Sequence, residues 1–193
     1  MRVLKAFSRR PEWLLDVLLI AGLFFVGGVA ILSFTGKLPY MLTLSRKPAS
    51  PEEKMNVALP ELTLPDVEGK PVSLASYRGK PLLLVFWSSH CHYCQQELPG
   101  IEKFHRQHPE LGLLGIGLND RKEGLAAYTK ANGFTFQTLW DEKNALASTL
   151  KPNGTPNFYC VDPDGKVGLV HWGTGVLDSP EFKKWLRQVA KPT

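Results

Sequence analysis

The sequence contains few cysteines: only Cys91, Cys94 and Cys160 occur among its 193 residues. A structural zinc site needs four ligands, and no second cysteine pair accompanies Cys91 and Cys94, so zinc binding is disfavoured. Internal repeats, low-complexity tracts, a glycine-rich phosphate loop and a Ser/His/Asp set are also absent. The sequence therefore shows no sign of a repeat protein, a nucleotide-phosphate site or a triad hydrolase.

The balanced charge of the C-terminal part of the chain disfavours a nucleic-acid partner. Although the net charge is +5, residues 1–56 contain eight Lys/Arg and four Asp/Glu, whereas residues 57–193 contain fifteen and fourteen. The basic excess is thus confined to the N-terminal segment, and we expect no binding to nucleic acid. A composition of 44% hydrophobic and 21% charged residues indicates a globular domain.

A long apolar run near the N-terminus predicts a membrane anchor. Residues 17–36 are uncharged and long enough, as a helix, to cross a hydrocarbon core of about 30 Å. A cleaved signal peptide is the alternative, but the run exceeds the usual apolar region and no Ala-x-Ala site follows it. We expect a cytoplasmic tail at 1–13, a transmembrane anchor at 14–36, a linker at 37–56, and a globular domain outside the cytoplasm at 57–193.

Beyond the linker, the pattern predicts strands that alternate with helices. Leu62–Leu64 and Val72–Leu74 flank a turn that contains Asp and Gly, which indicates a β-hairpin. Leu82–Trp87 is apolar on both faces, as in a central strand. The other expected elements are a helix from Cys91 to His108 bent at Pro99, a strand at 111–118, helices at 123–131 and 145–150, strands at 157–161 and 166–171 joined by an Asp162–Gly165 turn, and a last helix capped by Ser179. This order indicates an α/β fold.

The motif Cys91-His-Tyr-Cys94 follows the central strand directly. A cysteine at a helix N-terminus meets unpaired backbone N–H groups and the positive end of the helix dipole, which favour its thiolate. A purely structural disulfide is the alternative, but so short a loop adds little stability. We interpret Cys91 as the attacking thiol and Cys94 as the resolving thiol of an exchange reaction that needs no bound cofactor.

The histidines around Cys91 leave a second class of function open. His90 and His92 could stabilise the Cys91 thiolate by charge or hydrogen bonding. Together with the two cysteines they are also possible copper ligands, so a copper-binding accessory protein is the non-enzymatic alternative. We prefer the interpretation without a metal, because ligands this close in sequence rarely enclose one ion. Cys160 is expected to be a buried free thiol in a strand.

Several short motifs, taken in order, resemble one known family. They are Asp66–Leu74 with Gly79-Lys80, Trp87–Cys94, Glu97-Leu-Pro99, Asn119-Asp120, and Gly154-Thr-Pro156 followed by Val161-Asp162. Over residues 57–190 they resemble the thioredoxin fold, and more narrowly the membrane-anchored TlpA/ResA/DsbE (CcmG) branch of thiol–disulfide oxidoreductases. The resemblance implies a thioredoxin-like domain with an N-terminal β-hairpin extension.

The resemblance also implies roles for residues beside the cysteines. Thr155-Pro156 would be a cis peptide that docks the substrate backbone, and Glu97 would tune the thiols or relay protons. Trp87, His90 and His92 complete the predicted substrate-binding set. His90 stands where thioredoxin-like proteins often carry Trp, and His92-Tyr93 replaces Gly-Pro, which obscures the reductant role usual in this branch.

The predicted function is disulfide exchange with protein thiols and disulfides on the periplasmic side of the inner membrane. By the same resemblance, the chain could act as a reductant in cytochrome c or copper-site maturation, with a DsbD-type transmembrane reductase as partner. A general oxidase or isomerase stays open as the alternative, since the sequence leaves the direction of electron flow undetermined.

Overall fold

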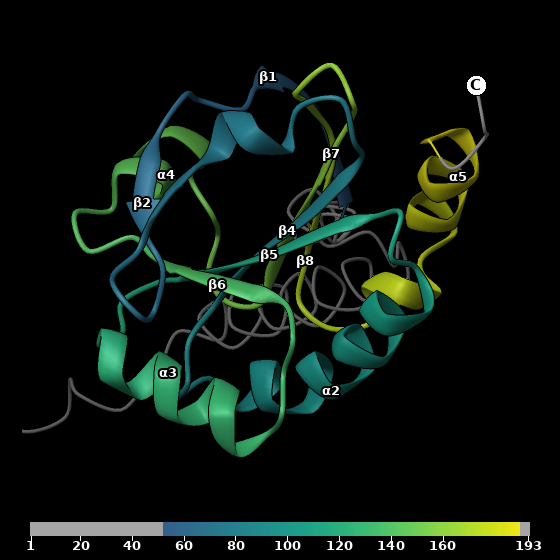
Figure 1. Cartoon of the computed structure of the whole chain (residues 1–193). Coiled ribbons are helices and arrows are strands. Elements are labelled where there is room, and N and C mark those ends of the chain that lie inside the picture. Colours follow the sequence, from purple (N-terminus) through teal and green to yellow (C-terminus); the bar gives the residue numbers. More distant parts are fainter. Residues whose placement is uncertain (1–51, 190–193) are drawn as a thin grey trace, which may run out of the picture. The chain divides into compact units, whose positions relative to one another are not determined.

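The computed structural model describes residues 52–189, which form a six-stranded mixed sheet flanked by helices (Figure 1). The sheet has the order β1-β8-β7-β4-β5-β6, and a separate hairpin pairs β2 with β3. The strands are β1 (Glu52–Ala58), β2 (Thr63–Pro65), β3 (Pro71–Ser73), β4 (Leu82–Trp87), β5 (Gly112–Gly117), β6 (Gln137–Trp140), β7 (Asn157–Val161) and β8 (Lys166–Trp172). The helices are α2 (His92–Gln107), α3 (Lys122–Ala131), α4 (Ala145–Leu150) and α5 (Pro180–Val189), with short 3-10 turns η2 (Leu74–Tyr77) and η3 (Val176–Asp178).

The sheet combines parallel and antiparallel pairs around the central strand β4. Strands β4, β5 and β6 run parallel, which the helical crossovers α2 and α3 make possible, whereas β7, β8 and β1 pair antiparallel in turn. This arrangement confirms the predicted α/β class and the predicted hairpin. The predicted anchor at 14–36 lies outside the described residues. Within residues 52–189, no helix is both long and apolar enough to span a bilayer.

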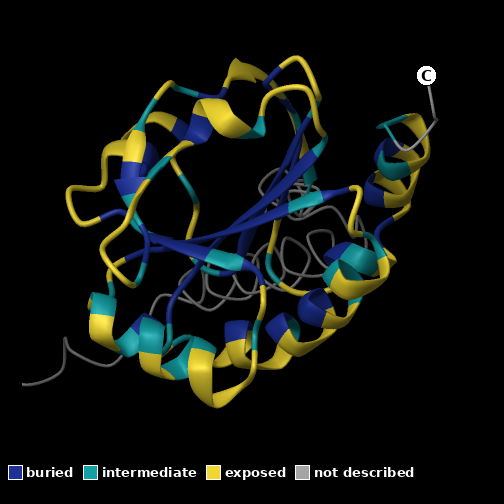
Figure 2. Cartoon of the chain, viewed as in Figure 1, coloured by how far each residue is buried: buried dark blue, intermediate teal, exposed yellow. Residues whose placement is uncertain are grey.

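Two apolar cores lie on the opposite faces of the sheet. One core packs β4, β5 and β7 against α2, α3 and α5; the other packs the sheet against the hairpin, η2 and α4. Figure 1 shows α2 and α3 together on one side of the sheet and α4 with the hairpin on the other. In Figure 2 the central strands β4, β5 and β7 are buried while the outer surfaces of the helices are exposed. The end of β4 that leads into α2 is therefore held from both faces.

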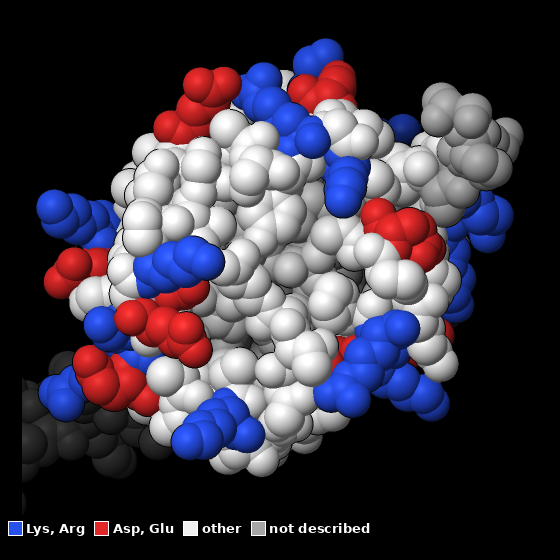
Figure 3. All heavy atoms as spheres, in the orientation of Figure 1, with Lys and Arg blue, Asp and Glu red and all other residues white. Residues whose placement is uncertain are grey.

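The charged side chains mix both signs on the face drawn in Figure 3. Lys and Arg alternate with Asp and Glu around its margin, and its hollowed centre is uncharged. No basic patch occupies this face, in keeping with the balanced composition of residues 57–193.

Strand β1 corrects the predicted boundary of the linker. Residues 52–56, assigned to the linker, belong to β1, which pairs with β8 from Glu52 opposite His171 to Ala58 opposite Lys166. The Glu52 carboxylate accepts a hydrogen bond from the Ser179 hydroxyl and lies 3.2 Å from Nδ1 of His171. The prediction was wrong here because an edge strand buries only part of one face and so keeps a polar composition.

Strand β6 was not predicted at all. Its four residues, Gln137–Trp140, extend the sheet beyond β5 in parallel. A run this short carries too little periodicity to be distinguished from a loop. The other predicted elements occur within one or two residues of their expected bounds, and Ser179 Oγ accepts a hydrogen bond from the Phe182 N–H as the expected helix cap.

A buried carboxylate fastens α2 to the segment that precedes β6. The side chain of Glu102 is 8% exposed and accepts hydrogen bonds from Arg106 Nε at 2.6 Å, from the Thr135 N–H at 2.9 Å and from Thr135 Oγ1 at 2.7 Å. Burial alone would raise the pKa of Glu102, but these donors together lower it below its ordinary value of 4.5. The ionised carboxylate therefore stabilises the position of the active-site helix.

We expect Glu102→Gln to lower the free energy of unfolding by about 2 kcal/mol at neutral pH, because buried donors lose their charged acceptor. A lowered pKa in the folded state stabilises the fold above pH 4.5, and this contribution is lost as the pH falls through the folded-state pKa. Urea unfolding of both proteins between pH 7 and pH 3 should show the difference shrinking below pH 4.5. The control is Glu110→Gln, since the exposed Glu110–His108 pair should contribute less than about 0.5 kcal/mol.

Candidate active site

Cys91 and Cys94 form a disulfide at the start of α2. Their Cα atoms are 5.2 Å apart, and Cys91 is the N-cap of the helix, with its Sγ 3.1 Å from the Cys94 N–H that donates to it. Cys94 is completely buried, whereas Cys91 is half-buried. A thiol from another molecule can thus reach Cys91 but not Cys94, which fits the predicted attacking and resolving roles.

The Thr155-Pro156 segment lies directly beside the reactive sulfur. The bond between these residues is cis, as the resemblance implied, and the Thr155 carbonyl oxygen is 3.3 Å from Cys91 Sγ. In the reduced protein the Cys91 S–H can donate a hydrogen bond to this carbonyl. The loop before β7 therefore forms one wall of the site, although it follows Cys91 by more than sixty residues.

Trp87 lies in the core directly before the segment that leads to Cys91. Its side chain is fully buried at the end of β4, and its ring packs against Tyr128 with 5.7 Å between centroids. A Cβ atom on Gly115 of β5 would lie 2.8 Å from the Trp87 indole nitrogen, so glycine there leaves room for the ring. This last strand position faces the core between the sheet and α2, and a substrate-binding role for Trp87 stays a prediction.

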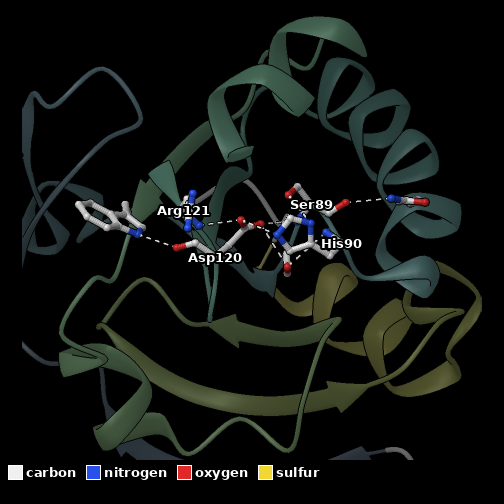
Figure 4. Close-up of polar contacts among 7 residues, drawn as sticks. Ser89, His90, Asp120 and Arg121 are labelled. Carbon is white, nitrogen blue, oxygen red and sulfur yellow. Dashed lines mark hydrogen bonds and ion pairs between the residues drawn. The ribbon is translucent and has the colours of Figure 1, made fainter. Parts of the chain in front are cut away.

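His90 faces a buried carboxylate, Asp120, in the loop after β5 (Figure 4). His90 Nε2 is 3.2 Å from Asp120 Oδ1, and the Asp120 side chain is fully buried while that of His90 is 74% exposed. Asp120 also accepts hydrogen bonds from Ser88 Oγ at 3.1 Å, the Ser89 N–H at 2.6 Å and the Arg121 N–H at 2.7 Å. One carboxylate thus holds every residue between the end of β4 and Cys91.

The donors around Asp120 keep it ionised. Burial would raise the pKa of Asp120, but hydrogen bonds from the Ser89 and Arg121 N–H groups and the Ser88 hydroxyl lower it below 3.8. The negative charge of Asp120 therefore persists at neutral pH, with Oδ1 3.2 Å from His90 Nε2.

His92 and Glu97 make contacts away from the sulfurs. His92 Nε2 lies 3.0 Å from Gln96 Nε2, and Glu97 Oε1 accepts a hydrogen bond of 2.9 Å from the Gly175 N–H in the loop after β8. Within residues 52–189, no hydrogen bond joins His90, His92 or Glu97 to either sulfur. Thiolate stabilisation by the histidines and proton relay by Glu97 stay predictions.

The structure also locates the third cysteine and the candidate copper ligands. Cys160 is a free cysteine buried in β7, as predicted, and burial raises the pKa of its thiol well above the ordinary range. Among the residues that the structure describes, no three His, Cys, Asp or Glu side chains are arranged to hold a metal ion.

Comparison with known proteins assigns the family. The sequence model of the AhpC/TSA family matches residues 55–170, which include the disulfide and the cis proline. The chain belongs to the AhpC/TSA family. This member has the thioredoxin-like α/β fold, and its relatives narrow the assignment.

Two bacterial proteins are similar in sequence to most of this chain. Thiol-disulfide oxidoreductase ResA of Geobacillus thermodenitrificans is 26% identical over 143 residues, which are 71% of this chain and 81% of ResA. Thioredoxin-like protein YneN of Bacillus subtilis is 27% identical over 176 residues, covering 89% of this chain and 96% of YneN. With the Cys91–Cys94 disulfide, these relatives identify this AhpC/TSA family member as a thiol–disulfide oxidoreductase.

A solved structure shares the fold. A secreted disulfide oxidoreductase of Mycobacterium tuberculosis, homologous to E. coli DsbE, has a TM-score of 0.59 at 22% identity. The match covers 66% of this chain and 96% of that protein. Nearly the whole of that solved structure therefore has the same fold as the matching part of this chain.

Three residues of the site were missed as functional groups in the sequence: Asp120, Tyr93 and Trp172. A signal existed for Asp120, because it follows β5 while Ser88 follows β4, and the carboxyl ends of neighbouring parallel strands meet at one edge of a sheet. Tyr93 and Trp172 carry no such signal, since they lie in α2 and β8, which the fold brings to either side of the cis proline.

Proposed function

We propose that this chain is a membrane-anchored oxidoreductase that exchanges disulfides with protein clients on the periplasmic side of the inner membrane. The observation that supports it best is the unequal burial of the two sulfurs: Cys91 is accessible at the helix N-terminus and 3.3 Å from the Thr155 carbonyl, while Cys94 is enclosed behind it. The uncharged run at residues 17–36 supports the anchor.

In the reducing direction, the Cys91 thiolate attacks one sulfur of a client disulfide. A bond forms between Cys91 and that sulfur, the client S–S bond breaks, and the other client sulfur leaves as a thiolate that takes up a proton. Cys94 then loses its proton and attacks Cys91 Sγ, which closes the Cys91–Cys94 disulfide and releases the second client thiol. Two electrons pass to the client, and the protein ends oxidised.

A redox partner must return two electrons to the Cys91–Cys94 pair after each cycle. We propose a transmembrane reductase of the DsbD type for this step, with an apocytochrome c or copper-site protein as client. The support is the similarity to ResA and to the DsbE homologue, together with the predicted anchor. The reaction is reversible, so the partner's potential fixes the direction of electron flow.

The test is a redox titration of the full chain in its membrane. Membranes are washed with alkaline carbonate, equilibrated with mixtures of reduced and oxidised glutathione, and treated with a maleimide that adds mass to each free thiol. We expect the chain to stay in the membrane pellet, and Cys91 and Cys94 to titrate together as a two-electron couple. Buried Cys160 should react only after denaturation. Release into the wash would contradict the anchor, and a Cys pair that never oxidises would contradict the exchange activity.

A further inference from the structure

An uncharged groove opens beside the reactive sulfur. It has a volume of about 370 Å³ and is lined by two glycines and by Tyr93, Asn153, Thr155, Pro156, Trp172 and Thr174. None of these side chains carries a charge. Tyr93 is 62% exposed and Trp172 is 44% exposed, and they are two of the three large hydrophobic residues exposed within residues 52–189. Two of these three apolar side chains thus flank a single groove, and exposed apolar surface of this kind marks binding sites.

The walls of the groove are tied to one another and to the disulfide. Thr155 lies against Cys91 Sγ, and Tyr93 follows Cys91 by two residues at the start of α2. Trp172 is opposite Asn157 in the β7–β8 pair, and the Gly173 N–H donates to the Pro156 carbonyl at 2.9 Å. The two aromatic side chains are therefore held by regular structure on both sides of the cis proline, so the groove exists before a client arrives.

A second groove, on the side of Cys91 that bears His90, has the opposite character. It measures about 580 Å³, and its lining includes four charged residues, Asp120, Arg121, Asp141 and Glu142, together with His90, Trp140, Gly117, Asn119 and Asn144. A client polypeptide joined to Cys91 by a disulfide thus meets an uncharged wall toward Tyr93, and toward His90 a wall on which Arg121 and Glu142 are exposed. The contrast gives the site a means of distinguishing the residues around a client cysteine.

We propose that the groove between Tyr93 and Trp172 selects clients in which an aromatic or large aliphatic residue adjoins the reactive cysteine. The proposal rests on the exchange activity proposed above, because formation of the mixed disulfide brings the client's neighbouring residues to this groove. An apolar side chain there leaves water for the two rings. A charged side chain would lose water without gaining a counter-charge, since the lining offers none.

The test uses the full chain in its oxidised form and short peptides with one cysteine. A peptide thiolate attacks Cys91 and displaces Cys94, and a second peptide thiol then attacks the mixed disulfide, leaving the reduced protein and a disulfide-linked peptide dimer. The peptides differ only in the residue before or after the cysteine, which is Phe, Ser, Glu or Lys. Each rate is divided by that of the same peptide with oxidised glutathione, which removes differences in thiol pKa.

We expect the corrected rate of a Phe peptide to exceed those of the Glu and Lys peptides by about tenfold, with Ser between them. Trp172→Ala and Tyr93→Ala should each reduce the Phe-to-Glu ratio to about twofold. The control is Val57→Ala, which removes the third exposed apolar side chain far from the groove in sequence and should leave the ratio unchanged. Equal rates for all peptides, or a ratio that survives both aromatic replacements, would overturn the proposal. Failure of every thiol, glutathione included, to reduce the protein would instead reject the exchange activity itself.

Discussion

Replacing Cys94 with Ser is expected to trap the chain in mixed disulfides with its clients through Cys91. The buried resolving thiol is then missing, so the bond between Cys91 and the client sulfur has no internal group to break it. Steady-state exchange should fall by about a hundredfold or more, because resolution must await a thiol from solution in place of one held in contact. Non-reducing electrophoresis of membranes after acid quenching, followed by mass spectrometry, measures the trapped species.

Two further variants make this result specific. Cys91→Ser should trap no client, since the remaining Cys94 is completely buried, and it should be inactive. Cys160→Ala should retain nearly all activity, because this thiol is enclosed in β7. The two-thiol mechanism would be refuted if Cys160→Ala lost activity, or if adducts formed on Cys94 in the Cys91→Ser protein.

We expect Asp120→Asn to slow Cys91 alkylation by about tenfold and to lower the free energy of unfolding by about 2 kcal/mol. The ionised carboxylate accepts hydrogen bonds from Ser88, Ser89 and Arg121, whereas an amide offers one oxygen and adds unwanted donors. The loop that positions Cys91 should loosen. Because Asp120 has a lowered pKa in the folded protein, its stabilisation is present above pH 3.8 and is lost as the pH falls through the folded-state pKa.

The measurement is iodoacetamide alkylation of the reduced protein between pH 5 and pH 9, with urea unfolding in parallel. The alkylation rate of Asp120→Asn should fall across this whole pH range, because the loop that positions Cys91 has lost its charged acceptor. Asp178→Asn is the control, because Asp178 is 94% exposed and its contact with Lys183 is 3.4 Å long. An unchanged profile with reduced stability would show that Asp120 serves the fold alone.

The parts of this fold that could be predicted are those in which local chemistry and burial agree. Leu82–Trp87 is apolar at every position because β4 is covered on both faces, so the run alone identified a central strand. The Asp162–Gly165 turn was equally clear, and Gly165 has the positive φ of 83° that its position requires. Cys91 at the start of a helix followed from the same kind of reasoning.

The parts that failed depend on contacts between distant segments. Glu52–Asn56 was assigned to the linker because its partners, β8 and Ser179, lie more than a hundred residues later. The full burial of the Trp87 ring could not be predicted from its place before the motif, because it depends on packing against Tyr128. The orientation of His90 could not be predicted, since it is set by Asp120, thirty residues further on, and not by the neighbouring cysteine.

The pairing of β1 with β8 also determines how a mechanical load would enter the domain. A pull on the chain ahead of Glu52 acts at the end of β1 that lies opposite His171, one residue before Trp172. In the loop after β8, the Thr174 carbonyl accepts a hydrogen bond from His171. The Gly175 N–H of this loop donates to Glu97 on α2. Peeled from that end, an antiparallel pair breaks one rung at a time and does not shear along its whole length. The rung at that end, Glu52 opposite His171, is therefore next in sequence to Trp172 of the groove beside Cys91.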